Sequence, residues 1–215
     1  MTERLILITG ASRGLGYATA LALAEPGTHI IALARTVGGL EELDDAIKAK
    51  GGTATLVPLD ITDDGGLERL GLSIHERWGR LDAWVHTAAH AVPLSPAEHI
   101  APKDLDRGWA VNARGTQRLI AMMDPLLRAA PQGKAVIATH EPGSEKFWGA
   151  YRASKIAQRA IAEAWAAETE RLGLHVRLFE PAPMATALRA RFFPGEDRDD
   201  LANPADEAAR LIREL

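Results

Sequence analysis

The sequence predicts a doubly wound α/β domain, a three-layer sandwich in which helices cover both faces of a mainly parallel sheet of about six strands. Two observations predict it. Short apolar runs alternate with longer stretches of helix formers along the 215 residues, and each crossover between parallel strands needs such a helix. A glycine-rich segment at 10–16 separates the first apolar run from the first helical stretch, as in phosphate-binding turns. No linker or repeat interrupts the pattern, so we expect a single domain over residues 1–215.

The first half of the chain predicts three strands and three helices. Arg4 to Ile8 is rich in branched residues and too short for a typical helix, so it is predicted to be a strand. A helix is expected from Tyr17 to Ala24, where Glu25-Pro26-Gly27 ends it. The elements that follow are strand 28–33, helix 39–50, strand 53–59 and helix 63–78. Thr62 is expected to cap the last of these helices.

The second half continues the alternation. It predicts strands at 81–87, 135–139 and 175–179, and helices at 103–130, 148–172 and 205–214. The segment at about 181–204 contains several prolines and is long for a plain connection. We expect it to be a flexible loop that covers the substrate.

Composition excludes several classes of function. A net charge of −4 gives no reason to expect a nucleic-acid partner, and the lack of cysteine excludes disulfides and thiolate sites. His86 and His90 flank a strand end without an acidic ligand between them, so no metal site is expected. No signal peptide precedes the first strand, and no apolar run approaches the ~20 residues of a membrane span. We expect a cytoplasmic protein without a membrane partner.

The glycine segment, Thr-Gly-Ala-Ser-Arg-Gly-Leu-Gly from Thr9 to Gly16, places backbone N–H groups at a helix N-terminus, where a pyrophosphate can bind. Gly10 permits a tight turn, Gly14 lets phosphates approach the backbone, and Gly16 lets the helix pack against the strand. The segment lacks the Gly-Lys-Ser/Thr ending of an ATPase P-loop. The predicted cofactor contacts here are Gly10, Ser12, Arg13, Gly14, Leu15 and Gly16.

Tyr151 and Lys155 lie four residues apart in the helix expected at 148–172, and therefore on one helix face. A neighbouring ammonium favours phenolate and would lower the tyrosine pKa from its usual value of about 10. Tyr151 would then be a general acid or base near neutral pH. Taken alone, this common spacing favours a surface contact between the two side chains on an amphipathic helix over a catalytic pair.

The glycine turn, Asp60, Val111-Asn112 and the Tyr151/Lys155 pair follow one another at intervals that resemble the short-chain dehydrogenase/reductase family, from about residue 5 to 186. The resemblance implies a Rossmann-type fold and an NAD(P)-dependent oxidoreductase acting on a small carbonyl or alcohol. It implies that Tyr151 is the acid/base, that Lys155 lowers its pKa and binds the nicotinamide ribose, and that Asn112 holds a water in a proton relay.

The same resemblance implies further cofactor contacts. Asp60 would contact the adenine and Thr186 the nicotinamide carboxamide, and Ile61, Ala88 and Pro181 would also line the cofactor site. Arg35 replaces the acidic residue that binds two ribose hydroxyls at the end of the second strand, and Arg13 lies in the glycine turn. Two guanidiniums suit a 2′-phosphate, which favours NADP over NAD, unless these side chains simply face solvent.

Three departures from the family pattern bear on activity. His86-Thr87-Ala88-Ala89 replaces Asn-Asn-Ala-Gly, and Pro181-Ala182 replaces Pro-Gly. His140 occupies the position of the catalytic serine, with Thr139 directly before it and Ser144 as a more remote hydroxyl. Either Thr139 or His140 could take over the role of the serine. Because tyrosine, lysine and asparagine are present, an active reductase is favoured over a weak or inactive dinucleotide-binding sensor or regulatory scaffold.

The resemblance also bears on assembly. Family members commonly add a seventh strand after the last helix, which this sequence does not extend to, so assembly through that strand is not expected. We expect a homodimer through the two long helices at 103–130 and 148–172.

Overall fold

A parallel six-stranded sheet forms the centre of the protein, which a computed structural model describes over residues 3–141 and 143–215. The strands lie in the order β3-β2-β1-β4-β5-β6, and every neighbouring pair is parallel. Their bounds are β1 Arg4–Thr9, β2 Thr28–Ala34, β3 Thr53–Pro58, β4 Ala83–His86, β5 Lys134–Ala138 and β6 His175–Phe179. The predicted doubly wound α/β fold is confirmed.

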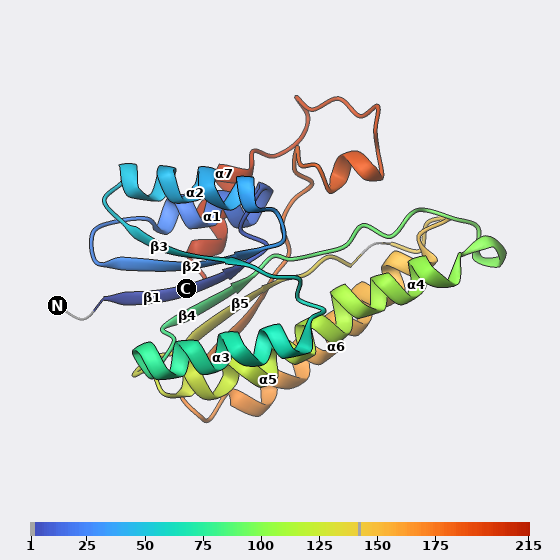
Figure 1. The fold of residues 1–215 in the computed structure, drawn as a ribbon. Helices are drawn as coiled ribbons and strands as arrows, with labels where there is room; N and C mark the ends of the chain where they lie inside the picture. Colours follow the sequence, from blue (N-terminus) through green and yellow to red (C-terminus); the bar gives the residue numbers. More distant parts are fainter. Residues whose placement is uncertain (1–2, 142) are drawn as a thin grey trace.

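Helices cover both faces of the sheet. Helices α1, α2 and α7 lie on one face, and α3, α5 and α6 lie on the other (Figure 1). Their bounds are α1 Gly14–Leu23, α2 Val37–Ala49, α3 Asp64–Trp78, α4 Pro102–Gly108, α5 Gly115–Arg128, α6 Gly149–Thr169 and α7 Pro204–Ile212. None of the helices in the described residues has both the length and the apolar character required to cross a bilayer.

The apolar run of β1 is explained by burial on both faces of the sheet. Ile6 and Ile8 pack with buried side chains of α1, α2 and α7, whereas Leu5 and Leu7 pack with those of α3, α5 and α6. Parallel strands between two helical layers are apolar on both faces, which gives continuous rather than alternating runs. The sheet thus separates two cores, and its carboxyl ends are left to form a site.

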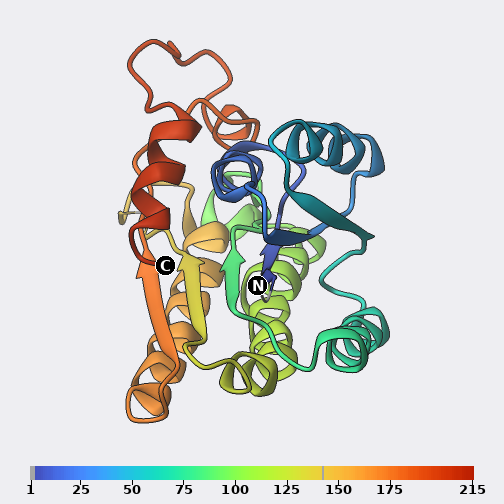
Figure 2. The ribbon, with the colours of Figure 1, turned by 90° about the vertical axis from the view of Figure 1, so that its left-hand side faces the viewer.

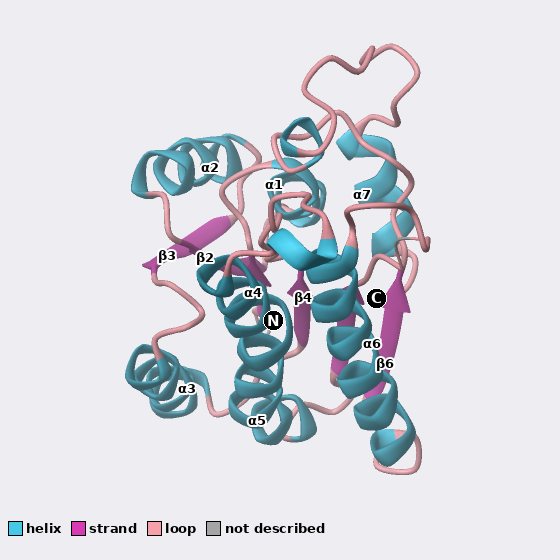
Figure 3. Cartoon of the chain, turned by 90° about the vertical axis from the view of Figure 1, so that its right-hand side faces the viewer, coloured by secondary structure: helices cyan, strands magenta, loops and turns pink. Residues whose placement is uncertain are grey.

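The helix predicted at 103–130 is interrupted by a different helical geometry. Residues Trp109–Arg114 form a π-helical segment between α4 and α5, which continue the same rod before and after it (Figure 3). A π-helical turn closes its hydrogen bonds one residue further along the chain than an α-helical turn. Asn112 lies within this wider turn and is fully buried.

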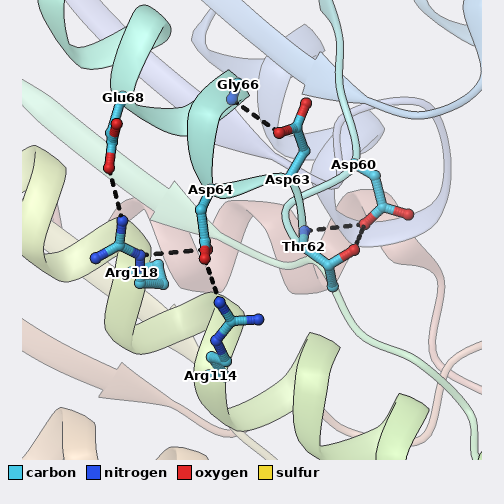
Figure 4. Close-up of polar contacts among 8 residues, drawn as sticks. All are labelled: Asp60, Thr62, Asp63, Asp64, Gly66, Glu68, Arg114 and Arg118. Atoms are coloured by element: carbon cyan, nitrogen blue, oxygen red, sulfur yellow. Dashed lines mark hydrogen bonds and ion pairs between the residues drawn. The ribbon is translucent and has the colours of Figure 1, made fainter.

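The cap of α3 differs from the prediction, which named Thr62. Asp63 is the N-cap, and its carboxylate accepts the N–H of Gly66 at 3.0 Å (Figure 4). Thr62 lies one residue too early and instead donates its N–H and hydroxyl back to Asp60 Oδ1, at 3.0 and 2.8 Å. Asp64, the first residue of the helix, is bound by Arg114 and Arg118. Thr62 therefore stabilises the turn after β3 and does not cap α3.

The segment at 181–204 is irregular apart from a 3-10 turn at Arg189–Arg191, and part of it projects beyond the helices at one end of the molecule (Figure 2). Its two ends are held together by a parallel bridge between Met184 and Ala202. Near its start, the backbone N–H of Ala182 donates to Glu207 of α7 at 2.9 Å. The loop is therefore anchored at its base.

Candidate functional site

A cavity of about 460 Å³ lies at the carboxyl ends of the strands. This volume falls in the range of sites for small molecules. The cavity spans the point between β1 and β4 where the strand order reverses, which is where doubly wound folds bind ligands. All the predicted cofactor contacts line it: Gly10, Ser12, Arg13, Gly14, Leu15, Gly16, Arg35, Asp60, Ile61, Ala88, Tyr151, Lys155, Pro181 and Thr186.

The glycine turn has the geometry that an anion cradle needs. Gly10 and Gly14 have φ angles of 88° and 59°, which L-residues with side chains rarely adopt. A Cβ at Gly16 would lie 2.4 Å from the carbonyl oxygen of Gly10, so only glycine allows α1 to pack this close to β1. In the part of the chain that the structure describes, no side chain caps the N-terminus of α1, so its first N–H groups can bind an anion. The turn therefore fits a phosphate group.

One end of the cavity is charged. Asp60 Oδ2 lies 2.7 Å from Nη2 of Arg107 and 3.7 Å from Nη1 of Arg35. Burial raises the pKa of Asp60, but hydrogen bonds from Arg107 and Thr62 outweigh burial and bring the pKa below its usual value. Arg35 is more than half exposed and lines the cavity with Arg13. No sequence pattern indicated Arg107, because it lies on α4 and is 47 positions away from Asp60.

Tyr151 lies in an aromatic environment at the other end of the cavity and is only 2% exposed. Its ring centroid is 4.8 Å from that of Phe192, 5.7 Å from Trp148 and 5.9 Å from His140. Burial raises the pKa of Tyr151 above its usual value, so the predicted lowering by Lys155 is wrong for this structure. Tyr151 is consequently a neutral phenol that can donate a proton. No sequence pattern indicated Phe192, which belongs to the irregular loop.

Lys155 is buried in the wall of the same cavity. Its ammonium donates to the carbonyl oxygen of Ala138 at 3.4 Å and to Oε1 of Gln158. Among the described residues, these two oxygens accept from the ammonium, and no hydrogen bond joins it to the phenol of Tyr151. Burial lowers the pKa of Lys155 to about 8, while the carboxylate of Glu180 acts in the opposite direction.

Asn112 lies behind the cavity wall rather than in the lining. Its side-chain oxygen accepts the N–H of His90 at 2.7 Å, and its amide donates to the His90 carbonyl oxygen at 3.0 Å. The amide also donates to Ser154 Oγ at 2.9 Å. Asn112 therefore joins the segment after β4 to α6, at the residue directly before Lys155.

Two of the three candidates for the serine position reach the cavity. The backbone N–H of Thr139 donates to the Phe179 carbonyl oxygen at 2.8 Å, and its hydroxyl lies 3.4 Å from the same atom. His140 lines the cavity next to Tyr151. Burial, and then the charge of Lys155, lower the pKa of His140, so its imidazole is neutral at neutral pH. Ser144 is exposed and does not line the cavity.

Comparison with known proteins agrees with this geometry. The family model described as "short chain dehydrogenase" matches residues 4–197. The oxidoreductase YciK of Escherichia coli K12 is 30% identical over 211 residues, which cover 96% of this chain and 83% of that protein.

Solved structures show the same fold. A short chain dehydrogenase from Salmonella enterica superposes with a TM-score of 0.88 at 28% identity, covering 95% of this chain and 86% of that one. A short chain dehydrogenase from Escherichia coli CFT073, complexed with NADPH, superposes with a TM-score of 0.87 at 30% identity, covering 96% and 88%.

Proposed function

The chain belongs to the short-chain dehydrogenase/reductase family of oxidoreductases, and from this membership we propose that it is an NADPH-dependent reductase of a small aldehyde or ketone, with Tyr151 as the proton donor. The observation that carries the proposal is the position of Tyr151 and Lys155 in one cavity wall. The opposite part of that cavity is lined by a glycine turn that fits a phosphate. In addition, the relative from E. coli CFT073 was solved with NADPH.

We propose that the cavity holds a dinucleotide along its length. The turn at 10–16 would hold the pyrophosphate, Arg13 and Arg35 the 2′-phosphate, and Asp60 with Ile61 the adenine. Ala88, Pro181, Thr186 and Lys155 would line the nicotinamide riboside. When bound, the nicotinamide supplies the hydride.

The chain's own groups would manage the proton and the carbonyl oxygen. The raised pKa of Tyr151 keeps its phenol protonated at neutral pH, so it can donate to the oxygen as the carbonyl is reduced. His140 would donate a ring N–H to the same oxygen in place of the usual serine hydroxyl, since its ring lies next to that of Tyr151. The loop at 181–204 would cover the substrate, because Met184, Leu188 and Phe192 line the cavity.

The alternative is a dinucleotide-binding sensor or scaffold with little turnover, which the altered serine position favours. The purified protein should be incubated with NADPH and a panel of aldehydes, ketones and quinones. A reductase oxidises NADPH in the presence of at least one carbonyl substrate, and this oxidation depends on Tyr151. Tight NADPH binding with no turnover across the panel would instead support the sensor.

Substitution of Arg35 by aspartate tests the preference for NADP. A carboxylate there repels the 2′-phosphate and can accept hydrogen bonds from the ribose hydroxyls of NADH. We expect the ratio of NADPH to NADH affinity to fall at least about tenfold, which corresponds to the loss of one charge-assisted contact. Titration of both cofactors measures this ratio. An unchanged ratio would mean that Arg35 faces solvent.

A homodimer through the two long helices is part of the proposal, as is a cytoplasmic location. Trp109 and Ile156, on the π-helical segment and α6, are 44% and 38% exposed and supply apolar surface for such an interface. We expect sedimentation at micromolar concentration to give the mass of a dimer. Substitution of both residues by glutamate should then yield a folded monomer, whereas a wild-type monomer would contradict the prediction.

A further inference from the structure

A chain of buried hydrogen bonds connects Lys155 to the core behind the cavity. The ammonium of Lys155 donates to Oε1 of Gln158, and Nε2 of Gln158 donates to Thr116 Oγ1 at 3.0 Å. Thr116 Oγ1 in turn donates to the carbonyl oxygen of Asn112 at 2.8 Å. All four residues are at most 2% exposed, so the chain is shielded from solvent.

The orientation of the Gln158 amide follows from its partners. An ammonium has hydrogen-bond donors only, so the group that faces Lys155 must be the amide oxygen. The amide nitrogen then faces Thr116, whose single hydroxyl hydrogen is directed to Asn112 and whose oxygen is free to accept. A reversed amide would oppose donor to donor at Lys155. This series of hydrogen bonds from Lys155 to Asn112 therefore has one consistent assignment of donors and acceptors.

His86 fixes the same hydroxyl from the sheet side. Its Nε2 lies 2.9 Å from Thr116 Oγ1, and its Nδ1 lies 2.6 Å from Thr9 Oγ1. Since Thr116 Oγ1 must accept here, the proton of His86 is on Nε2 and its Nδ1 accepts from Thr9. Burial lowers the pKa of His86 to about 3, in agreement with a neutral ring. His86 therefore stays neutral near pH 7.

We propose that Gln158 is a positioning residue for Lys155. Its side-chain oxygen accepts from the ammonium and holds it at a buried position. Gln158 and the Ala138 carbonyl take two of the three ammonium hydrogens, and the third is left for the cavity that Lys155 lines. The inference rests on the proposed role of Lys155 in the reductase. Two side chains, Gln158 and Thr116, span the path from Lys155 to Asn112, where the family resemblance implied a water.

The remaining groups around Lys155 determine how strongly Gln158 matters. Glu180, at the end of β6, is the anionic group that favours the ammonium, and burial opposes it. Tyr151 on the same helix and His140 at the end of β5 are neutral near pH 7, as is His86 of β4. Gln158 is therefore a principal neutral acceptor for a charge that is costly to bury.

The test is the titration of Lys155 in Gln158→Met and Gln158→Glu variants. The chain has six lysines, so protein labelled with 13C at lysine Cε gives few signals, and Lys155→Arg identifies the one from Lys155. Methionine removes the acceptor from the protonated form, so the Lys155 pKa should fall by about one pH unit or more. Glutamate adds an opposite charge, so the pKa should rise by a similar amount. The pH above which kcat declines should move in the same two directions.

Thr169→Val is the matched control, because Thr169 is a buried residue of α6 whose hydroxyl, among the described residues, bonds within its own helix to the Trp165 and Ala166 carbonyl oxygens. It should lower thermal stability without shifting the Lys155 titration. An unshifted titration in folded Gln158→Met would overturn the proposal, and where that variant does not fold, an unshifted titration in Gln158→Glu does so. The NMR measurement needs no substrate, so a wild-type protein without turnover would refute the reductase alone.

Discussion

Replacement of Tyr151 by phenylalanine is expected to reduce kcat for carbonyl reduction by about three orders of magnitude, the size of a lost general acid. The substitution removes only the hydroxyl, and the ring keeps its contacts with Trp148 and Phe192. NADPH affinity should therefore change by no more than a few fold. Steady-state oxidation of NADPH and a direct binding titration measure the two quantities separately.

The chain contains a natural control for this experiment. Tyr17 is the only other tyrosine in the sequence, lies in α1 and does not line the cavity. Tyr17→Phe should keep wild-type turnover and similar stability. Activity of Tyr151→Phe within about tenfold of wild type would assign proton donation to another group, for which the neighbouring His140 is the first candidate.

Substitution of Gly16 by alanine is expected to have the largest effect on the fold and on cofactor binding together. The new Cβ would lie 2.4 Å from the Gly10 carbonyl oxygen and 2.5 Å from Thr87 Oγ1, so the glycine turn must shift. Overpacking of this kind costs about 2 kcal/mol in the free energy of unfolding. Because the shifted turn also forms the proposed phosphate site, NADPH affinity should fall at least about tenfold, as measured by titration alongside chemical denaturation.

Gly38→Ala controls for the added methyl group and for the loss of a glycine. Gly38 lies in α2, and a Cβ there would meet no heavy atom of the described residues within 4 Å, apart from its chain neighbours and the backbone of its own helix. Alanine should leave NADPH binding unchanged and stabilise the helix by up to about 1 kcal/mol. Equal stabilities for Gly16→Ala and wild type would show that α1 can move away from β1 without cost.

Most of the fold could be predicted because its signals are local. The strand at 175–179 was predicted with its observed bounds, since Gly173 and Pro181 delimit a short segment with three apolar residues among five. Residue composition could not predict two local features, the π-helical segment and the cap of α3. The π-helical segment at Trp109–Arg114 uses residues that suit an α-helix equally well, and Asp63 and Thr62 are both good caps. Tertiary contacts decide between such alternatives.

The candidate site was predictable where it follows a motif, and not where it depends on distant contacts. The glycine turn, Tyr151 and Lys155 line one cavity as their order along the chain implied. The predicted lowering of the Tyr151 pKa was wrong. Helix spacing alone shows neither that Lys155 donates to Gln158 nor that aromatic rings surround the phenol. Gln158 was within reach of sequence reasoning, since it lies three residues after Lys155 on the same helix face.

The bridge between Met184 and Ala202 holds the two ends of the loop together, so we expect residues 187–201 within it to be exchangeable. Because the two ends of the loop are already held together, a change in its length alters chiefly the entropy of closing it, and doubling the length costs only about 0.6 kcal/mol. Thr186 lies against Gly14 of the glycine turn and has to be kept, whereas Leu188 and Phe192, further along the loop, would be replaced in the cavity. We therefore expect variation confined to residues 187–201, with Thr186 kept, to change the proposed substrate preference without altering the proposed cofactor site.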